Sequence, residues 1–195
     1  LYQSRLFSVT AFISLAVSFY HIGGIFDAEI EFYLVMLGLA ALIGLAGVFL
    51  LKKWKDATFA LPLFISAQVL EAAILLISIS AFAVKVFDPG TSTSLLWNLA
   101  HIFTWIFAFI FYVISDSLYP FIFFPWLAAG TLIPIPWFIG TAFDLESLGA
   151  TILLLIWGVI LSGAGELAYR FETTRKYSLP ILLASLPTFT LAIID

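Results

Sequence analysis

Long apolar runs separated by short charged breaks dominate this chain of 195 residues. A helix needs about 20 consecutive apolar residues to cross the roughly 30 Å hydrocarbon core of a bilayer. Segments that approach this requirement run over residues 5–26, 32–51, 57–87, 95–117, 119–142, 147–170 and 178–194. We therefore predict an all-α, polytopic transmembrane bundle of about seven helices, with residues 1–195 forming a single integral-membrane domain.

The composition excludes an ordinary water-soluble domain. Hydrophobic residues make up 63% of the chain and charged residues 10%, so the polar surface is too small to cover a soluble fold. The chain has no cysteine, which excludes disulfides, iron–sulfur ligation by thiolates and cysteine nucleophiles. The lipid bilayer is therefore the first partner that we expect.

The breaks between the apolar segments have the chemistry of loops. Residues 27–31 are acidic, residues 52–56 form a short basic turn, and residues 88–94 combine turn and helix-capping residues. The fifth segment contains Pro120, Pro125, Pro134 and Pro136. We expect this segment to be kinked or broken, because proline removes a backbone donor and clashes with the preceding turn.

The first apolar segment has to be distinguished from a secretory signal. It is too long for the apolar core of a signal peptide, and no small-residue cleavage site follows it. We expect this segment to be retained as a spanning helix.

The basic residues predict the orientation of the bundle. If successive helices alternate in direction, seven of the eight basic residues fall on one face: Arg5, Lys52, Lys53, Lys55, Arg170, Arg175 and Lys176. The other face has only Lys85, together with Asp27, Glu29, Glu31, Asp88, Asp144 and Glu146. Short loops rich in Lys and Arg stay cytoplasmic. We therefore predict a multi-pass protein of the cell membrane with its N-terminus inside and its C-terminus outside.

The two histidines of the chain are His21 and His101, in the first and fourth segments. At 1.5 Å per residue, both are predicted roughly 8 to 10 Å below the outer surface. Two neutral imidazoles that face each other across a bundle are the axial ligands of a low-spin haem b. We expect His21 and His101 to hold the haem iron, and Lys85 to pair with a haem propionate at the outer interface.

Several neighbouring residue types are compatible with a haem. Gly24 lies on the same helical face as the first histidine and would let a porphyrin edge approach the backbone. Trp97 and Trp105 lie one turn on either side of the second histidine. Ser18 and Asn98 each precede a histidine by about one turn and are candidates to orient its imidazole.

The two histidines are also compatible with roles that involve no haem. An interfacial histidine can simply hydrogen-bond to a backbone carbonyl or to a lipid headgroup. A histidine can also transfer protons, and a zinc site would need Glu29 or Glu31 to fold back as a further ligand.

A second candidate site lies near the centre of the third segment, where Glu71 follows Gln68 on one helical face. A charged carboxylate at that depth is costly unless it is paired, protonated or hydrated. The pair is a candidate to bind a quinone head group, to relay a proton or to coordinate a solute. The structural alternative is a protonated carboxyl bonded to a neighbouring helix.

The remaining polar and small residues are interpreted as architecture. Glu166 and Arg170 are spaced for a local ion pair, and Asp116 marks the inner interface or joins a polar cluster with Glu166. Two stripes of small residues predict close helix packing: Ala40, Gly44 and Gly47 in the second segment, and Gly158, Ser162 and Gly165 in the sixth.

Several chemistries lack their motifs. The chain has no glycine-rich phosphate loop, no paired-aspartate prenyl-transfer motif and no intramembrane protease motif. The last segment lacks the lysine that retinal would require, and the few juxtamembrane basic residues give no support for nucleic-acid binding. We therefore do not expect the chain to be a catalytic subunit on its own.

Three function classes follow. The first is a subunit of a respiratory or other electron-transfer complex, which holds haem b near the outer face and works with quinone and with membrane or extracytoplasmic subunits. The second is a small-solute or proton-coupled transporter that uses the intramembrane Glu71. The third is a structural membrane subunit without a cofactor. We favour the first, because it alone explains why the two imidazoles share a depth.

Overall fold

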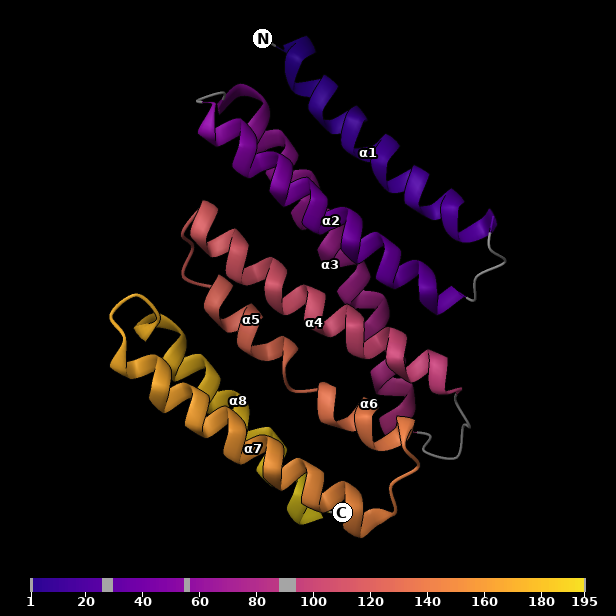
Figure 1. The fold of residues 1–195 in the computed structure, drawn as a ribbon, viewed down its shortest axis with the longest axis vertical. Coiled ribbons are helices and arrows are strands. Elements are labelled where there is room, and N and C mark those ends of the chain that lie inside the picture. The colour runs from indigo at the N-terminus through magenta and orange to yellow at the C-terminus, as the bar shows by residue number, and fades with distance from the viewer. Residues whose placement is uncertain (1, 26–29, 55–56, 88–93, 195) are drawn as a thin grey trace. The chain divides into compact units, whose positions relative to one another are not determined.

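The computed structural model describes residues 2–25, 30–54, 57–87 and 94–194. These residues form helices joined by turns, without a strand among them, which confirms the all-α prediction (Figure 1). The helices are α1 (Tyr2–Ile25), α2 (Ile30–Lys53), α3 (Ala57–Phe87), α4 (Leu95–Leu118), α5 (Phe124–Thr131), α6 (Ile135–Ala142), α7 (Ser147–Arg170) and α8 (Arg175–Ile194).

Within the described residues, four helices are long and apolar enough to cross a membrane. Their apolar spans are Phe32–Lys53, Thr58–Ala83, Leu95–Leu118 and Ser147–Arg170. Large apolar side chains such as Val69, Leu76 and Val159 are more than half exposed on these helices, as expected where the solvent is lipid. By length and apolarity, these helices are therefore those of a membrane protein, as the composition predicted.

The contacts divide the chain into two compact units, Leu1–Thr91 and Ser92–Asp195. In the first unit, α2 packs along α3, and α1 contacts both. In the second unit, α4 contacts both α5 and α6, and α7 packs along α8. These two groups are joined because α5 contacts α8 and α6 contacts α7. The prediction of one bundle over the whole chain stays a prediction.

Small residues allow the helices of the first unit to approach closely. A Cβ atom added at Gly44 of α2 would lie 2.5 Å from the Phe12 ring of α1 and 3.4 Å from the Ala67 Cβ of α3. At Gly47 it would lie 3.1 Å from Leu63, and Ala40 is fully buried. The predicted packing role of this stripe is confirmed.

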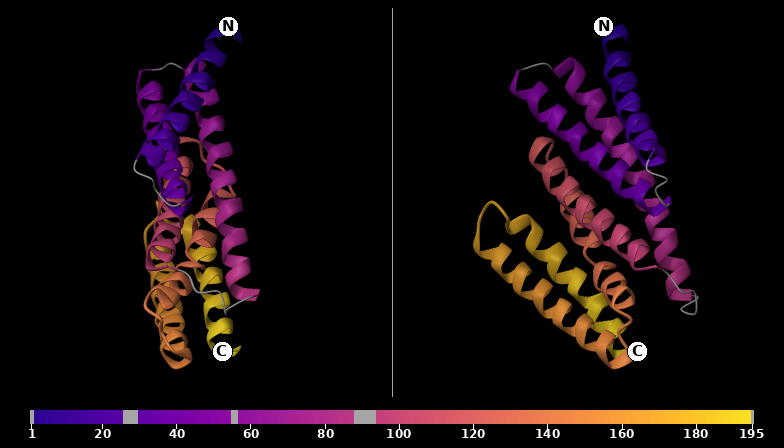
Figure 2. Two further views of the ribbon diagram at one scale, coloured as in Figure 1. Left: turned by 90° about the vertical axis from the view of Figure 1, so that its right-hand side faces the viewer. Right: turned by 45° about the vertical axis from the view of Figure 1, so that its right-hand side comes forward.

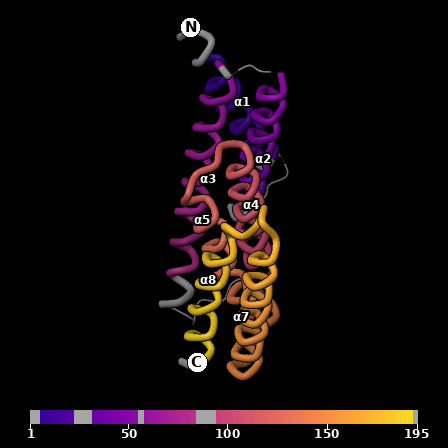
Figure 3. Tube along the Cα trace, turned by 90° about the vertical axis from the view of Figure 1, so that its left-hand side faces the viewer, coloured from indigo at the N-terminus to yellow at the C-terminus, as the bar shows by residue number. Residues whose placement is uncertain are grey.

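The second predicted stripe packs α7 against α8. A Cβ atom at Gly158 would lie 2.7 Å from Phe189, and one at Gly165 would lie 2.6 Å from Leu182. Between these two contacts, the Ser162 hydroxyl donates to Ser185 Oγ at 3.1 Å. The two helices run side by side as an antiparallel pair (Figures 2 and 3).

The fifth predicted segment is broken, as its prolines predicted, into α5 and α6 of eight residues each. At about 12 Å, each is too short to cross a bilayer alone. The predicted start at residue 119 is wrong, because α5 begins at Phe124. Pro125 lies in the first turn of this helix, where a backbone N–H would have no partner within the helix, so its absence costs no hydrogen bond. Pro136 cannot donate to the Leu132 carbonyl, and the Trp157 indole of α7 donates to it instead at 3.0 Å.

Two predicted loop signals give defined helix ends. Ser94 caps α4, since its hydroxyl accepts a hydrogen bond from the Trp97 N–H at 3.1 Å. After α6, Asp144 adopts a positive φ of 47°, which Asp tolerates better than most residues. The Asp144 N–H bonds to the Thr141 carbonyl, and the Leu145 N–H bonds to the Gly140 carbonyl. This is the pattern of a Schellman cap.

Candidate functional site

Glu71 is part of a buried stripe that runs along α3. This stripe consists of Ala60, Phe64, Ala67, Glu71, Ile74 and Ser78. Ala67 faces Gly44 of α2, and Glu71 follows it by one helical turn. The carboxyl therefore belongs to the helix-packing side of α3, roughly midway along the apolar span Thr58–Ala83.

Neither carboxyl oxygen of Glu71 has a hydrogen-bond partner among the described residues, and the side chain is only 1% exposed. A buried charge without a partner is strongly unfavourable, so such a group is most stable in its neutral, protonated form. Gln68 lies one turn earlier and is half-buried. The arrangement can therefore bind and release a proton whenever water or a ligand reaches Glu71.

The two histidines have contrasting environments in separate units. His21 in α1 is exposed, and its ring meets Tyr20 edge-on with centroids 6.1 Å apart. Tyr20 in turn lies 4.8 Å from Tyr33 of α2. His101 in α4 is 1% exposed. That both rings share one haem iron stays a prediction.

The surroundings of His101 test how well a haem would fit there. Its imidazole stacks on Phe138 of α6, with ring centroids 5.0 Å apart and planes 10° apart. Trp97 lies 4.3 Å away, centroid to centroid, so the predicted aromatic flank is present on one side. With these rings packed and the histidine buried, a macrocycle fits beside His101 only if the aromatic packing opens. The haem at His101 therefore stays a prediction.

The residues expected to orient the imidazoles also bond elsewhere. Ser18 donates its proton to the Ser14 carbonyl at 2.8 Å. Asn98 donates to the Ser94 carbonyl at 3.3 Å and accepts from the Thr141 hydroxyl of α6 at 2.8 Å. Asn98 therefore ties α4 to α6 beside His101.

Some predicted participants lie outside the described side chains. These are Gly24 in α1, Lys85 in α3, and the acidic residues Glu29 and Glu31. Their proposed roles toward a haem propionate or a zinc ion stay predictions. Among the described residues, no three His, Cys, Asp or Glu side chains gather where they could hold a metal ion.

A polar cluster joins the end of α4 to the start of α8. The Asp116 carboxylate, 2% exposed, forms an ion pair with the Lys176 ammonium. It also accepts a hydrogen bond of 2.7 Å from the Tyr177 hydroxyl. Burial and the neighbouring carboxylate raise the pKa of Tyr177, so this phenol remains a donor.

The partners of Asp116 differ from those that the sequence suggested. Glu166 does not share the cluster with Asp116 through any described ion pair. It pairs with Arg170 at 3.7 Å on the exposed side of α7, as its spacing predicted. Lys176 could have been suggested as a partner of Asp116, because the predicted topology placed both residues on the same membrane face.

Comparison with protein-family models found no matching family, and no curated protein or solved structure matches the chain.

Proposed function

We propose that this chain is a multi-pass membrane protein in which Glu71 takes up and releases a proton, as part of small-solute or proton-coupled transport. The observation that supports this proposal best is the buried Glu71 carboxyl without a hydrogen-bond partner among the described residues. An acidic residue at a helix centre costs about 2.5–3.5 kcal/mol on insertion scales. Buried polar groups in native structures are rarely left unsatisfied, so a functional reason for retaining Glu71 is favoured.

Gln68 supports the same proposal as a neighbouring polar group. Its amide lies one turn from Glu71 on the same face of α3 and is half-buried. An amide one turn away has both a donor and an acceptor for a solute or water that approaches the carboxyl.

Proton movement through liposomes that contain the purified chain would test this function. A potassium diffusion potential drives protons inward, and a trapped pH-sensitive dye reports their entry, with and without candidate solutes outside. We expect Glu71→Gln to abolish the flux, because the amide cannot exchange a proton. The matched control is Glu166→Gln, which alters an exposed carboxylate and should leave the flux unchanged.

Infrared spectroscopy gives an independent readout of the same group. The wild-type protein should show the carbonyl band of a protonated, poorly hydrated carboxylic acid, and this band should disappear in Glu71→Gln. A flux that survives Glu71→Gln would contradict the proposal, and so would the absence of the band from the wild type.

An electron-transfer subunit with haem b is the second candidate. It is supported by the Trp97 ring beside His101 and by the matching depths predicted for the two histidines. If bound, the haem would carry an electron between quinone and a partner subunit, with His21 and His101 as iron ligands and Lys85 near a propionate. Because the His101 ring is enclosed, we rank this candidate below transport.

A reduced-minus-oxidised absorption spectrum of the purified chain tests the haem. The haem proposal expects a Soret band that is lost in His21→Ala and in His101→Ala. Transport instead depends on Glu71 and needs no pigment. If all three substitutions affect only stability, the chain is a structural subunit.

A further inference from the structure

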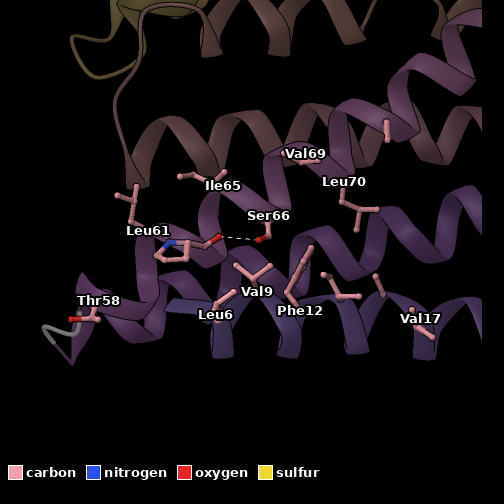
Figure 4. Close-up of a pocket in the computed structure, with 14 residues that line it drawn as sticks. Leu6, Val9, Phe12, Val17, Thr58, Leu61, Ile65, Ser66, Val69 and Leu70 are labelled. Carbon is pink, nitrogen blue, oxygen red and sulfur yellow. Dashed lines mark hydrogen bonds between the residues drawn. The ribbon is translucent and has the colours of Figure 1, made fainter. Parts of the chain in front are cut away.

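An apolar groove separates α1 from α3 in the first unit. It has a volume of about 850 Å³. Leu6, Val9, Phe12 and Val17 of α1 lie along one wall, and Leu61, Ile65 and Val69 of α3 along the other (Figure 4). Ser66 also lines the groove, but its hydroxyl donates to the Pro62 carbonyl at 3.0 Å. The groove therefore presents an almost uniformly apolar surface.

The groove has a polar end that lies close in the chain to two lysines. Thr58 lines it at the beginning of α3, directly after the α2–α3 connection. α2 ends in Lys52 and Lys53, both exposed, and the exposed ring of Trp54 follows. Lysines bind anionic headgroups, and tryptophan prefers the membrane–water interface. The groove thus leads from a polar end at Thr58, which closely follows the two lysines in the chain, into an apolar interior.

The length of the groove suits an acyl chain. The α3 wall extends from Thr58 to Ala73, which is about 22 Å along a helix at 1.5 Å per residue. One leaflet contributes about half of the 30 Å hydrocarbon core, so the groove can take an acyl chain along its full depth.

We propose that this groove binds an anionic glycerophospholipid. An acyl chain lies between α1 and α3, and the phosphate-bearing headgroup lies against Lys53 and Lys52 at the end of α2. The apolar lining binds the acyl chain, and the lysines favour a negatively charged headgroup. This site is independent of Glu71, which does not line the groove.

Native mass spectrometry of the full chain tests the proposal. The purified protein is incubated with equal amounts of phosphatidylglycerol and phosphatidylcholine that have identical acyl chains. We expect retained lipid to be mainly phosphatidylglycerol. Lys53→Gln should lower its retention roughly fivefold, from the electrostatic contribution of one lysine near an anionic headgroup. Arg170→Gln, also in the last turn of a long helix, is the control and should have little effect.

A second pair of variants tests the groove itself. Ile65→Trp places a large ring in the groove and should reduce the retention of both lipids. Ile160→Trp on α7 is the matched control, because the two isoleucines are 53% and 51% exposed. Circular dichroism confirms that each variant keeps its helices. The substitution Lys53→Gln leaves the groove intact, so it tests the proposal even if Ile65→Trp fails to fold.

Each alternative outcome overturns the proposal. Equal retention of the two lipids would mean that charge is not recognised. An unchanged Ile65→Trp variant would place the lipid elsewhere. A lipid-free dimer that dissociates in Ile65→Trp would identify a second copy of the chain as the occupant.

Discussion

Two buried carboxyl groups in this protein have opposite surroundings. Asp116 forms an ion pair with the Lys176 ammonium and accepts a hydrogen bond from the Tyr177 hydroxyl. Glu71, in contrast, has no hydrogen-bond partner among the described residues. A carboxylate held by charge-assisted bonds stabilises the fold. A buried carboxyl without a hydrogen-bond partner weakens it.

Asp116→Asn should destabilise the protein by about 1–3 kcal/mol, because the bonds that it weakens are made by a charged acceptor. Thermal unfolding in detergent, followed by circular dichroism, measures the change. Glu166→Gln disrupts an exposed ion pair and should change stability by less than about 0.5 kcal/mol. Equal effects of the two substitutions would show that the α4–α8 cluster adds no stability.

Two glycines on α7 allow a second test with a matched control. A Cβ atom added at Gly165 would lie 2.6 Å from Leu182 Cγ and 3.2 Å from its backbone nitrogen. Gly165→Ala should therefore cost about 1–3 kcal/mol through overpacking. At Gly163 an added Cβ meets no atom within 4 Å, so Gly163→Ala should be neutral or slightly stabilising. A Gly165→Ala variant that unfolds like Gly163→Ala would contradict the close packing of α7 and α8.

At the scale of elements, the break between α5 and α6 follows from proline. Pro134 and Pro136 lack the N–H groups that would bond to Gly130 and Leu132 in a continuous helix. The Ile133 N–H bonds to the Gly130 carbonyl at 3.3 Å, and Trp157 supplies the missing donor to Leu132. The break is thus stabilised by a side chain from another helix.

Trp157→Phe should destabilise the protein by about 0.6–1.7 kcal/mol, from the average to the maximum measured for hydrogen bonds between membrane helices. Pro136→Ala restores a backbone donor near Leu132, so the cost of Trp157→Phe should shrink in that background. A double-mutant cycle of unfolding free energies measures this coupling. Strictly additive effects would contradict the role assigned to the indole.

The sequence predicted the elements well because each depends on local chemistry. Apolar length predicted the helices, Ser94 predicted a cap, and the prolines predicted the broken segment. The small-residue stripes predicted the contact faces of α2 and α7. The partners of Asp116 were missed, since hydropathy gives the depth of a residue and not its neighbours. For the same reason, the similar depth predicted for His21 and His101 did not reveal that one is exposed and the other enclosed by aromatic rings.

At the scale of the whole molecule, the basic residues predict one inside face. The absence of native cysteine makes single-cysteine labelling a clean test. Trp54→Cys and Thr174→Cys should react with an impermeant maleimide only from the cytoplasmic side, and Leu145→Cys only from the outside. Labelling of Trp54→Cys and Leu145→Cys from the same side would contradict the predicted topology.

The division into two units has a consequence for biosynthesis. All contacts that join α1, α2 and α3 arise within Leu1–Thr91. Once this stretch has left the ribosome, every surface that these three helices need for one another is available. The three helices can therefore associate before the second unit is complete, which would shorten the time that Glu71 spends facing lipid.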